Sequence, residues 1–155
     1  MRITVVAVGR LKERYWSDAC AEYLKRLGPY ADVRVVEIAD RDPGKGGEEK
    51  ALAREAEDVL RAIPEASHVI ALDVKGTPRT SEAFASRLSA LGLEGRSSVC
   101  FVIGGSVGLS DSVLARADER LSFGPMTLPH NLARVVLLEQ VYRAFRIARG
   151  EPYHK

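Results

Sequence analysis

Short apolar runs alternate with longer amphipathic segments along the whole chain of 155 residues. The apolar runs are rich in β-branched residues, as buried strands are, and occupy residues 3–8, 33–38, 68–73, 99–103 and 120–123. The amphipathic segments have helical spacing and occupy residues 11–27, 48–63, 81–91, 110–117 and 132–149. This alternation predicts an α/β fold with a largely parallel sheet, and the length predicts a single domain over residues 1–155.

Composition argues against several classes of protein. Cys20 and Cys100 lie outside any Cys-x-x-Cys pair, which favours two buried thiols in a reducing compartment. The three histidines are scattered, so we expect no metal site. No segment has the length of a membrane span or the pattern of a signal sequence, so we expect a cytoplasmic protein with no membrane partner. The net charge of +2 does not by itself indicate nucleic acid.

Two loops late in the chain carry the clearest sign of a ligand site. The first, residues 104–108 with the sequence Gly-Gly-Ser-Val-Gly, follows a predicted strand, where bare backbone lets a ligand approach closely. The second, residues 121–130, contains no Lys, Arg, Asp or Glu. Parallel strands deliver their following loops to one edge of the sheet, so both loops and Leu72-Asp73 converge if their strands are neighbours. Without cations to hold a phosphate, such a pocket suits an adenine ring and a positively charged group.

Other interpretations of these features stay open at this point. The glycine loop alone is also typical of a tight turn between a strand and a helix. Arg143, Arg146 and Arg149 form one stripe on the last helix, which is usual for a solvated face. His154 lies at a chain end, where disorder is the default. A nucleotide hydrolase is disfavoured, because the chain has neither a phosphate-binding Gly-x-x-x-x-Gly-Lys-Ser/Thr motif nor a carboxylate cluster for magnesium.

Taken together and in order, these segments resemble the SPOUT-class RNA methyltransferases, and within them the small enzymes that methylate N3 of a pseudouridine in the 23S ribosomal RNA. The resemblance covers essentially the whole chain. Its segments are residues 7–12, 103–108, 126–130, 139–144 and 153–155. The loop over residues 39–47 matches the family pattern least.

The resemblance implies a fold, a cofactor and partners. The fold is a parallel-sheet SPOUT (α/β knot) fold with a C-terminal trefoil knot, a rare exception to the usual rules of chain connection. The cofactor is S-adenosyl-L-methionine, and the protein is a homodimer that acts on large-subunit ribosomal RNA in the assembled ribosome. The expected cofactor-binding residues come from the ends of three strands: Leu72, Gly104, Gly105, Phe123, Gly124, Pro125, Met126, Thr127 and Leu128.

The expected catalytic residues are Arg143, Tyr153 and His154. The N3 atom carries a proton that must leave, and histidine titrates near neutral pH, so His154 is the expected proton acceptor. Arg143 is expected to orient a phosphate or a base carbonyl, and Tyr153 to stack on or hydrogen-bond to the flipped base. The alternative function is a non-catalytic, ribosome-associated RNA-binding protein that uses the same basic helix.

Overall fold

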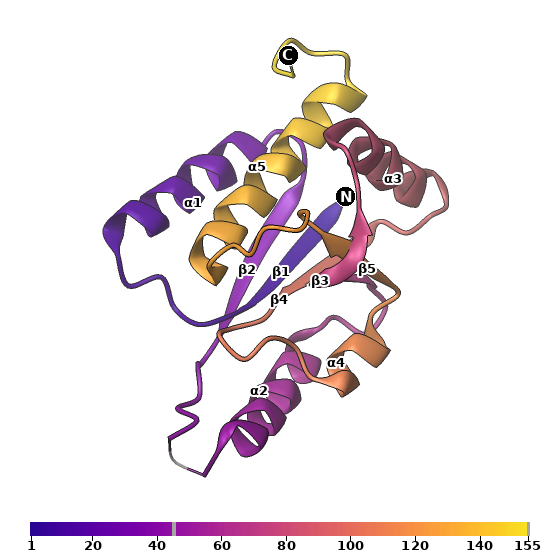
Figure 1. Ribbon diagram of the computed structural model, residues 1–155. Coiled ribbons are helices and arrows are strands. Elements are labelled where there is room, and N and C mark those ends of the chain that lie inside the picture. The colour runs from indigo at the N-terminus through magenta and orange to yellow at the C-terminus, as the bar shows by residue number, and fades with distance from the viewer. Residues whose placement is uncertain (45, 155) are drawn as a thin grey trace.

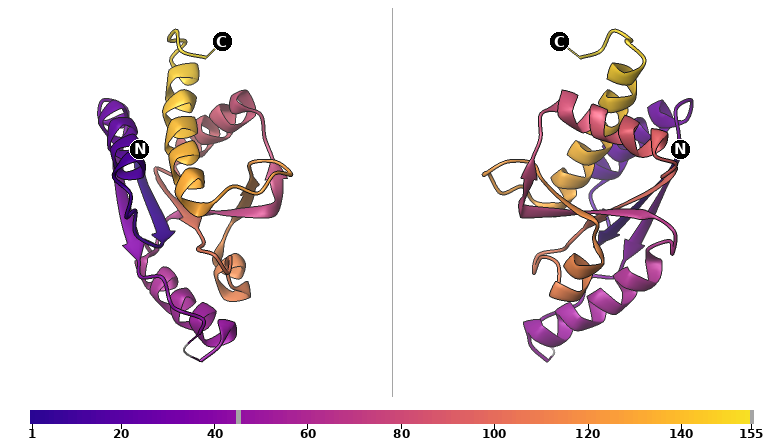
Figure 2. Two further views of the ribbon diagram at one scale, coloured as in Figure 1. Left: turned by 60° about the vertical axis from the view of Figure 1, so that its left-hand side comes forward. Right: turned by 90° about the vertical axis from the view of Figure 1, so that its right-hand side faces the viewer.

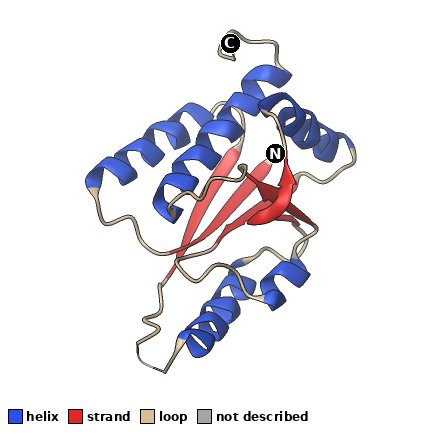
Figure 3. Cartoon of the chain, viewed as in Figure 1, coloured by secondary structure: helices blue, strands red, loops and turns tan. Residues whose placement is uncertain are grey.

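The structure, a computed structural model, describes residues 1–44 and 46–154 (Figure 1). Strands and helices alternate along the chain, as the sequence pattern predicts (Figure 3). The elements are β1 (Arg2–Val8), α1 (Arg14–Leu27), β2 (Asp32–Ile38), α2 (Glu48–Ala62), β3 (His68–Pro78), α3 (Ser81–Leu93), β4 (Ser98–Ile103), α4 (Asp111–Arg116), β5 (Glu119–Ser122) and α5 (His130–Ala148).

The five strands form one sheet in the order β2-β1-β4-β3-β5, and every pair is parallel. The predicted parallel α/β architecture is therefore confirmed. Strands β4, β3 and β5 are neighbours, so the segments that follow them leave the same edge of the sheet.

Helices cover both faces of the sheet (Figures 1 and 2). Alternate side chains of each central strand point to opposite faces, and the buried residues divide accordingly. Val99, Phe101 and Ile103 of β4 pack with α1, α3 and α5, whereas Cys100 and Val102 pack beneath α2 and α4. Because both faces are covered, the strands appear in the sequence as continuous apolar runs rather than alternating ones.

Strand β3 is longer than the sequence predicts. We expect a turn at residues 75–78, but the strand continues to Pro78 after a break in register, and Leu72 and Thr77 both pair with Leu121. Gly76 allows this, because a Cβ atom there would lie 2.8 Å from the backbone carbon of Arg120. The extension keeps the backbone of β3 beside the segment that follows β5.

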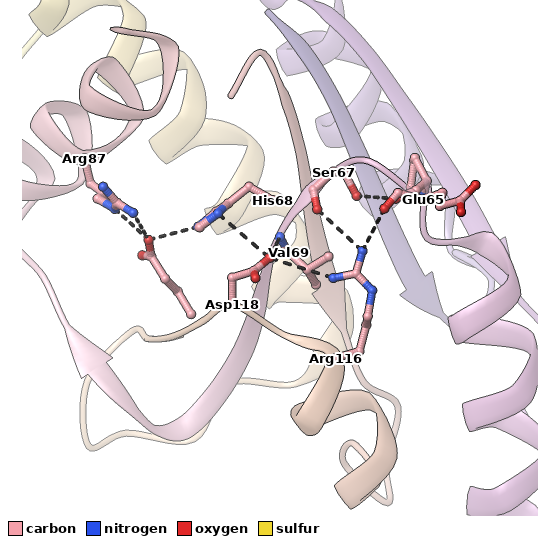
Figure 4. Close-up of polar contacts among 9 residues, drawn as sticks. Glu65, Ser67, His68, Val69, Arg87, Arg116 and Asp118 are labelled. Carbon is pink, nitrogen blue, oxygen red and sulfur yellow. Dashed lines mark hydrogen bonds and ion pairs between the residues drawn. The ribbon is translucent and has the colours of Figure 1, made fainter. Parts of the chain in front are cut away.

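An ion-pair network joins β3, β5 and α3 at the opposite, amino-terminal edge of the sheet (Figure 4). His68 Nε2 lies 3.0 Å from Glu119 Oε1, and Arg87 Nε donates to the same oxygen at 2.6 Å. Burial opposes the charge on Glu119, but the hydrogen bonds from Arg87 and His68 outweigh it and lower the pKa of that carboxyl. The network fixes the start of β5 and lies away from the cavity described below.

Helix α5 begins at His130, two residues before the predicted start, and packs against both α1 and α3. Pro129 is its N-cap residue. The trefoil threading of this C-terminal segment stays a prediction from the family resemblance.

Candidate active site

A cavity of about 480 Å³ lies at the carboxyl edge of β3, β4 and β5. It is bounded by the end of β3, the loop after β4, the loop after β5 and the first turn of α5. Eight of the nine predicted cofactor-binding residues line it: Leu72, Gly104, Gly105, Phe123, Gly124, Met126, Thr127 and Leu128. Pro125 is exposed and does not line the cavity, although it lies in the same loop. The predicted convergence of the three strand ends is confirmed.

The walls of the cavity are neutral or acidic. No Lys or Arg is among the lining residues, and the ionisable side chains there are Asp73 and His130. Asp73 Oδ1 accepts from the backbone N–H of Lys75 at 3.1 Å, and its Oδ2 lies 3.5 Å from Arg120. A cavity of this chemistry favours a flat apolar group together with a positive charge over a phosphate.

The glycine loop forms the wall on the β4 side. The backbone N–H of Gly108 donates to the carbonyl of Gly105 at 3.1 Å, which closes a tight turn. A Cβ atom at Gly104 would lie 2.8 Å from the carbonyl carbon and oxygen of Gly108, and one at Gly105 would lie 3.0 Å from Val8. The turn therefore requires glycine at 104, a side chain at 105 would need Val8 to shift, and the bare backbone faces the cavity.

The loop after β5 is held by one hydroxyl. Ser122 Oγ accepts from the backbone N–H of Gly124 at 3.1 Å and lies 3.3 Å from the carbonyl of Val74 on the extended part of β3. Gly124 adopts a φ of 113°, a conformation that favours glycine. Beyond it, Met126 is 82% exposed at the rim of the cavity, so a large apolar side chain stands in solvent beside the site.

A buried arginine fixes the start of α5 against β1 and β2. Arg134 is 2% exposed, and its guanidinium donates to Glu37 at 2.7 Å and to the carbonyl of Gly9 at 2.9 Å. The His130 ring lies beside Gly9 and lines the cavity. Sequence reasoning placed Asp73 and the loop that ends in His130 at this edge without assigning either side chain a role, and it missed Arg134. A charged residue inside an apolar helical run was the one available signal for Arg134.

The three predicted catalytic residues form a second cluster at the far end of α5. Arg143 donates to Glu139 at 2.6 Å and to Nδ1 of His154 at 3.0 Å, and its guanidinium lies 4.7 Å from the centre of the Tyr153 ring. Tyr153 donates its hydroxyl to Glu139 at 3.1 Å. His154 Nε2 lies 2.6 Å from Glu82 at the start of α3. The default expectation of a frayed end over residues 153–155 is wrong for Tyr153 and His154, because these contacts tie them to α3 and α5, and Lys155 lies outside the described residues.

These contacts set the proton states of the cluster. Burial, reinforced by the Glu139 carboxylate, raises the pKa of Tyr153 to about 12. The hydrogen bond to Glu139 raises the pKa of Arg143. Nδ1 of His154 accepts from Arg143, so its Nε2 donates to Glu82 in this arrangement. Tyr153 and Arg143 are therefore hydrogen-bond donors rather than bases.

The two clusters are separate within one chain. His130 and Arg143 are thirteen residues apart on α5, which is about 20 Å along the helix axis. Methyl transfer requires reacting atoms about 3–3.5 Å apart. The structure thus brings the predicted catalytic residues to one another but does not bring them to the cavity of the same chain.

Comparison with known families identifies the class of protein to which this fold and cavity belong. Residues 1–154 match the family model described as a predicted SPOUT methyltransferase, and the chain belongs to this family. Solved structures share the fold at low identity. One is a protein of a methylase family from Haemophilus influenzae, with a TM-score of 0.56 and 16% identity over 99% of this chain and 70% of that one. Another, from Legionella pneumophila, is described as a methyltransferase in complex with SAM, with a TM-score of 0.50 and 13% identity over 96% of this chain and 66% of that one.

Some relatives align with this chain over the full length of both proteins and at higher identity. The chain is 54% identical over 159 aligned residues to the ribosomal RNA large subunit methyltransferase H of Carboxydothermus hydrogenoformans, covering 100% of both proteins. It is 50% identical to the protein of the same name from Bacillus pumilus, again over 100% of both.

The structure also bears on membrane insertion, metal binding and the two cysteines. None of the helices within residues 1–44 and 46–154 is long and apolar enough to cross a membrane. Across that same part of the chain, no group of three or more His, Cys, Asp or Glu side chains is placed to hold a metal ion. Cys20 and Cys100 are both buried and unpaired, as predicted.

Proposed function

We propose that this protein transfers a methyl group from S-adenosyl-L-methionine to N3 of a pseudouridine in large-subunit ribosomal RNA. The observation that carries the proposal is the cavity at the β3–β4–β5 edge, which combines apolar walls, bare glycine backbone and one carboxylate, with no Lys or Arg among its lining residues. Membership of a methyltransferase family and the names of the full-length relatives support the reaction and the RNA.

The residues of the cavity fit this cofactor. Adenine suits the apolar side chains of Leu72, Ile103 and Leu128, and its ring edge suits the backbone groups of the loop after β5. Asp73 suits the positive charge that the cofactor carries. When bound, the cofactor supplies an electrophilic methyl group on its sulfonium.

The tail residues act on the acceptor base. His154 accepts the N3 proton once its Nδ1 leaves Arg143, because that nitrogen is occupied in the present arrangement. Arg143 then holds a phosphate or a base carbonyl, and Tyr153 stays protonated and stacks on or donates to the base. These groups need only position the base and move one proton, because methyl transfer of this kind needs no covalent intermediate.

In a homodimer, the tail of one subunit serves the cavity of the other. Arg143 lies about 20 Å from the cavity end of its own α5, so a tail that acts on the acceptor must serve the cavity of a partner subunit. Helix α5 offers a surface for that contact, since Val135, Val136 and Gln140 are only partly covered by the rest of the chain. Each active site then combines the cavity of one subunit with the tail of the other.

The substrate is the assembled ribosome in the cytoplasm. A chain with a net charge of +2 has a small electrostatic footprint for isolated RNA. A folded ribosomal particle has a defined surface shape that the protein contacts, and these contacts compensate for the small electrostatic footprint.

Calorimetry and a methylation assay test the proposal together. We expect the protein to bind S-adenosylmethionine and its demethylated product, and to methylate ribosomal particles far faster than isolated RNA. Binding to particles without cofactor binding or methyl transfer would contradict the proposal and favour the RNA-binding alternative.

A further inference from the structure

Most of the positive charge on α5 is already engaged within the chain. Arg143 pairs with Glu139, Arg146 with Glu151 and Tyr30, and Arg134 with Glu37. Arg149 lies over the Tyr30 ring at 4.5 Å and 3.9 Å from Glu151. Apart from Arg143, which contacts the acceptor nucleotide once His154 has left it, the helix that carries the predicted basic stripe offers few free phosphate contacts, so an RNA substrate requires cations elsewhere.

The connection from β1 to α1 supplies free cations. Arg10, Lys12 and Arg14 are all exposed within five consecutive residues, and the exposed Glu13 offsets one of their three charges. Arg10 and Lys12 make no side-chain hydrogen bond or ion pair within residues 1–44 and 46–154. Arg14 faces Asp18 at 3.6 Å with both side chains mostly in solvent, a pair that contributes little.

Two aromatic rings stand beside these cations. Tyr15 is 65% exposed on the first turn of α1. The Trp16 ring lies edge-on to it, with ring centres 5.2 Å apart. An exposed aromatic residue places apolar surface in contact with solvent, and beside cations it is typical of surfaces on which unpaired nucleobases stack.

This surface is joined to the cavity wall through the backbone of Gly9. The connection begins at Gly9, whose carbonyl accepts from Arg134 and which lies against the His130 ring in the cavity wall. Figure 1 shows the connection running from the end of β1 to the start of α1. Six residues lead from Gly9 to Tyr15, so the Cα atom of Tyr15 lies no more than about 20 Å from that of Gly9, a span that a few flanking nucleotides cover.

We propose that residues 10–16 form the surface that holds the single-stranded RNA flanking the target nucleotide, with Tyr15 stacking on a neighbouring base and Arg10 and Lys12 contacting phosphates. This inference rests on the proposed function and names the part of the chain that captures its substrate. RNA fits this surface better than a second copy of the chain, because a two-fold contact through it would bring Arg10, Lys12 and Arg14 against their own counterparts.

The test compares Tyr15→Ala and the double variant Arg10→Ala, Lys12→Ala with the wild type. The readouts are equilibrium binding to ribosomal particles across a salt series, steady-state methylation, calorimetry with S-adenosylmethionine, and sedimentation. We expect Tyr15→Ala to weaken particle binding and raise KM about tenfold, with kcat and cofactor affinity unchanged. We expect the double variant to reduce the slope of log K against log salt by about 0.7 for each phosphate that is no longer neutralised.

Two matched controls separate this role from general damage. Tyr15→Phe keeps the stacking ring and should bind particles like the wild type. Lys25→Ala removes a cation from the last turn of the same helix and should leave the salt slope unchanged. Wild-type particle binding by Tyr15→Ala and the double variant would overturn the surface, as would dissociation of the dimer in either variant. Tyr15-dependent binding in a protein that transfers no methyl group would support the surface and contradict the reaction.

Discussion

The cavity at the β3–β4–β5 edge and the C-terminal tail are built from different kinds of group. The cavity is made of backbone, glycines and apolar strand ends, and its shape follows from the parallel sheet itself. The tail cluster is made of charged and aromatic side chains, Arg143, Tyr153 and His154 with Glu139 and Glu82, drawn from three parts of the chain. The cavity suits binding, because its backbone is fixed in advance, and the tail suits contact with an acceptor base, because it presents hydrogen-bond donors and an imidazole.

The largest effect is expected where the cavity depends on bare backbone. Gly104→Val forces a side chain into the backbone of Gly108 and distorts the turn, so calorimetry should detect no binding of S-adenosylmethionine. Gly92→Ala is the matched control, because the added methyl group makes only an ordinary contact with Met1 at 3.5 Å. Wild-type affinity in Gly104→Val would remove the glycine loop from the cofactor site.

The tail should matter for transfer and not for cofactor binding. Deleting residues 153–155 should cut single-turnover methylation of ribosomal particles by about 100-fold or more, while calorimetry gives a cofactor affinity near that of the wild type. His154→Ala should reproduce much of the loss. A truncated protein within about threefold of the wild-type rate would assign the tail a structural role only.

Asp73 is the carboxylate among the residues that line the cavity. Asp73→Asn removes the negative charge while keeping the shape, so the affinity for S-adenosylmethionine should fall about tenfold. The demethylated product lacks the sulfonium charge, so its affinity should fall less. Equal calorimetric affinities for S-adenosylmethionine in Asp73→Asn and wild type would show that the carboxylate does not face the cofactor.

A smaller effect concerns the stability of the folded protein and depends on Glu55, a buried carboxyl on α2. Glu55 is 2% exposed, one of its oxygens has no partner in the described part of the chain, and burial, helped by nearby Asp40, raises the pKa of its carboxyl. A raised folded-state pKa means that the folded protein loses stability relative to the unfolded chain as pH rises above the ordinary value for Glu. Glu55→Gln should therefore stabilise the protein by on the order of 1 kcal/mol at pH 8 and by less at pH 4, measured by urea unfolding.

The difference between the cavity and the tail also explains which features could be predicted from the sequence. Apolar runs and helical spacing identified every strand and helix of the described residues, and the neutral loops identified seven cavity residues, because backbone sites depend on local composition. The extension of β3 past Gly76 was missed, because it depends on a close approach to Arg120 that no local pattern encodes. The order of the tail was missed for the same reason, since the partner of His154 on α3 is 72 residues away in the chain. Family resemblance, rather than spacing, identified Arg143, Tyr153 and His154.

Mixed dimers test most directly whether each active site joins the cavity of one subunit to the tail of the other. Gly104→Val and His154→Ala subunits are each expected to be nearly inactive as homodimers. Random exchange of equal amounts gives half mixed dimers, each with one intact cavity facing one intact tail, so about a quarter of the wild-type methylation rate should return. If cavity and tail act within the same chain, no mixed dimer contains an intact site, and a mixture that stays as inactive as its two components would contradict the account.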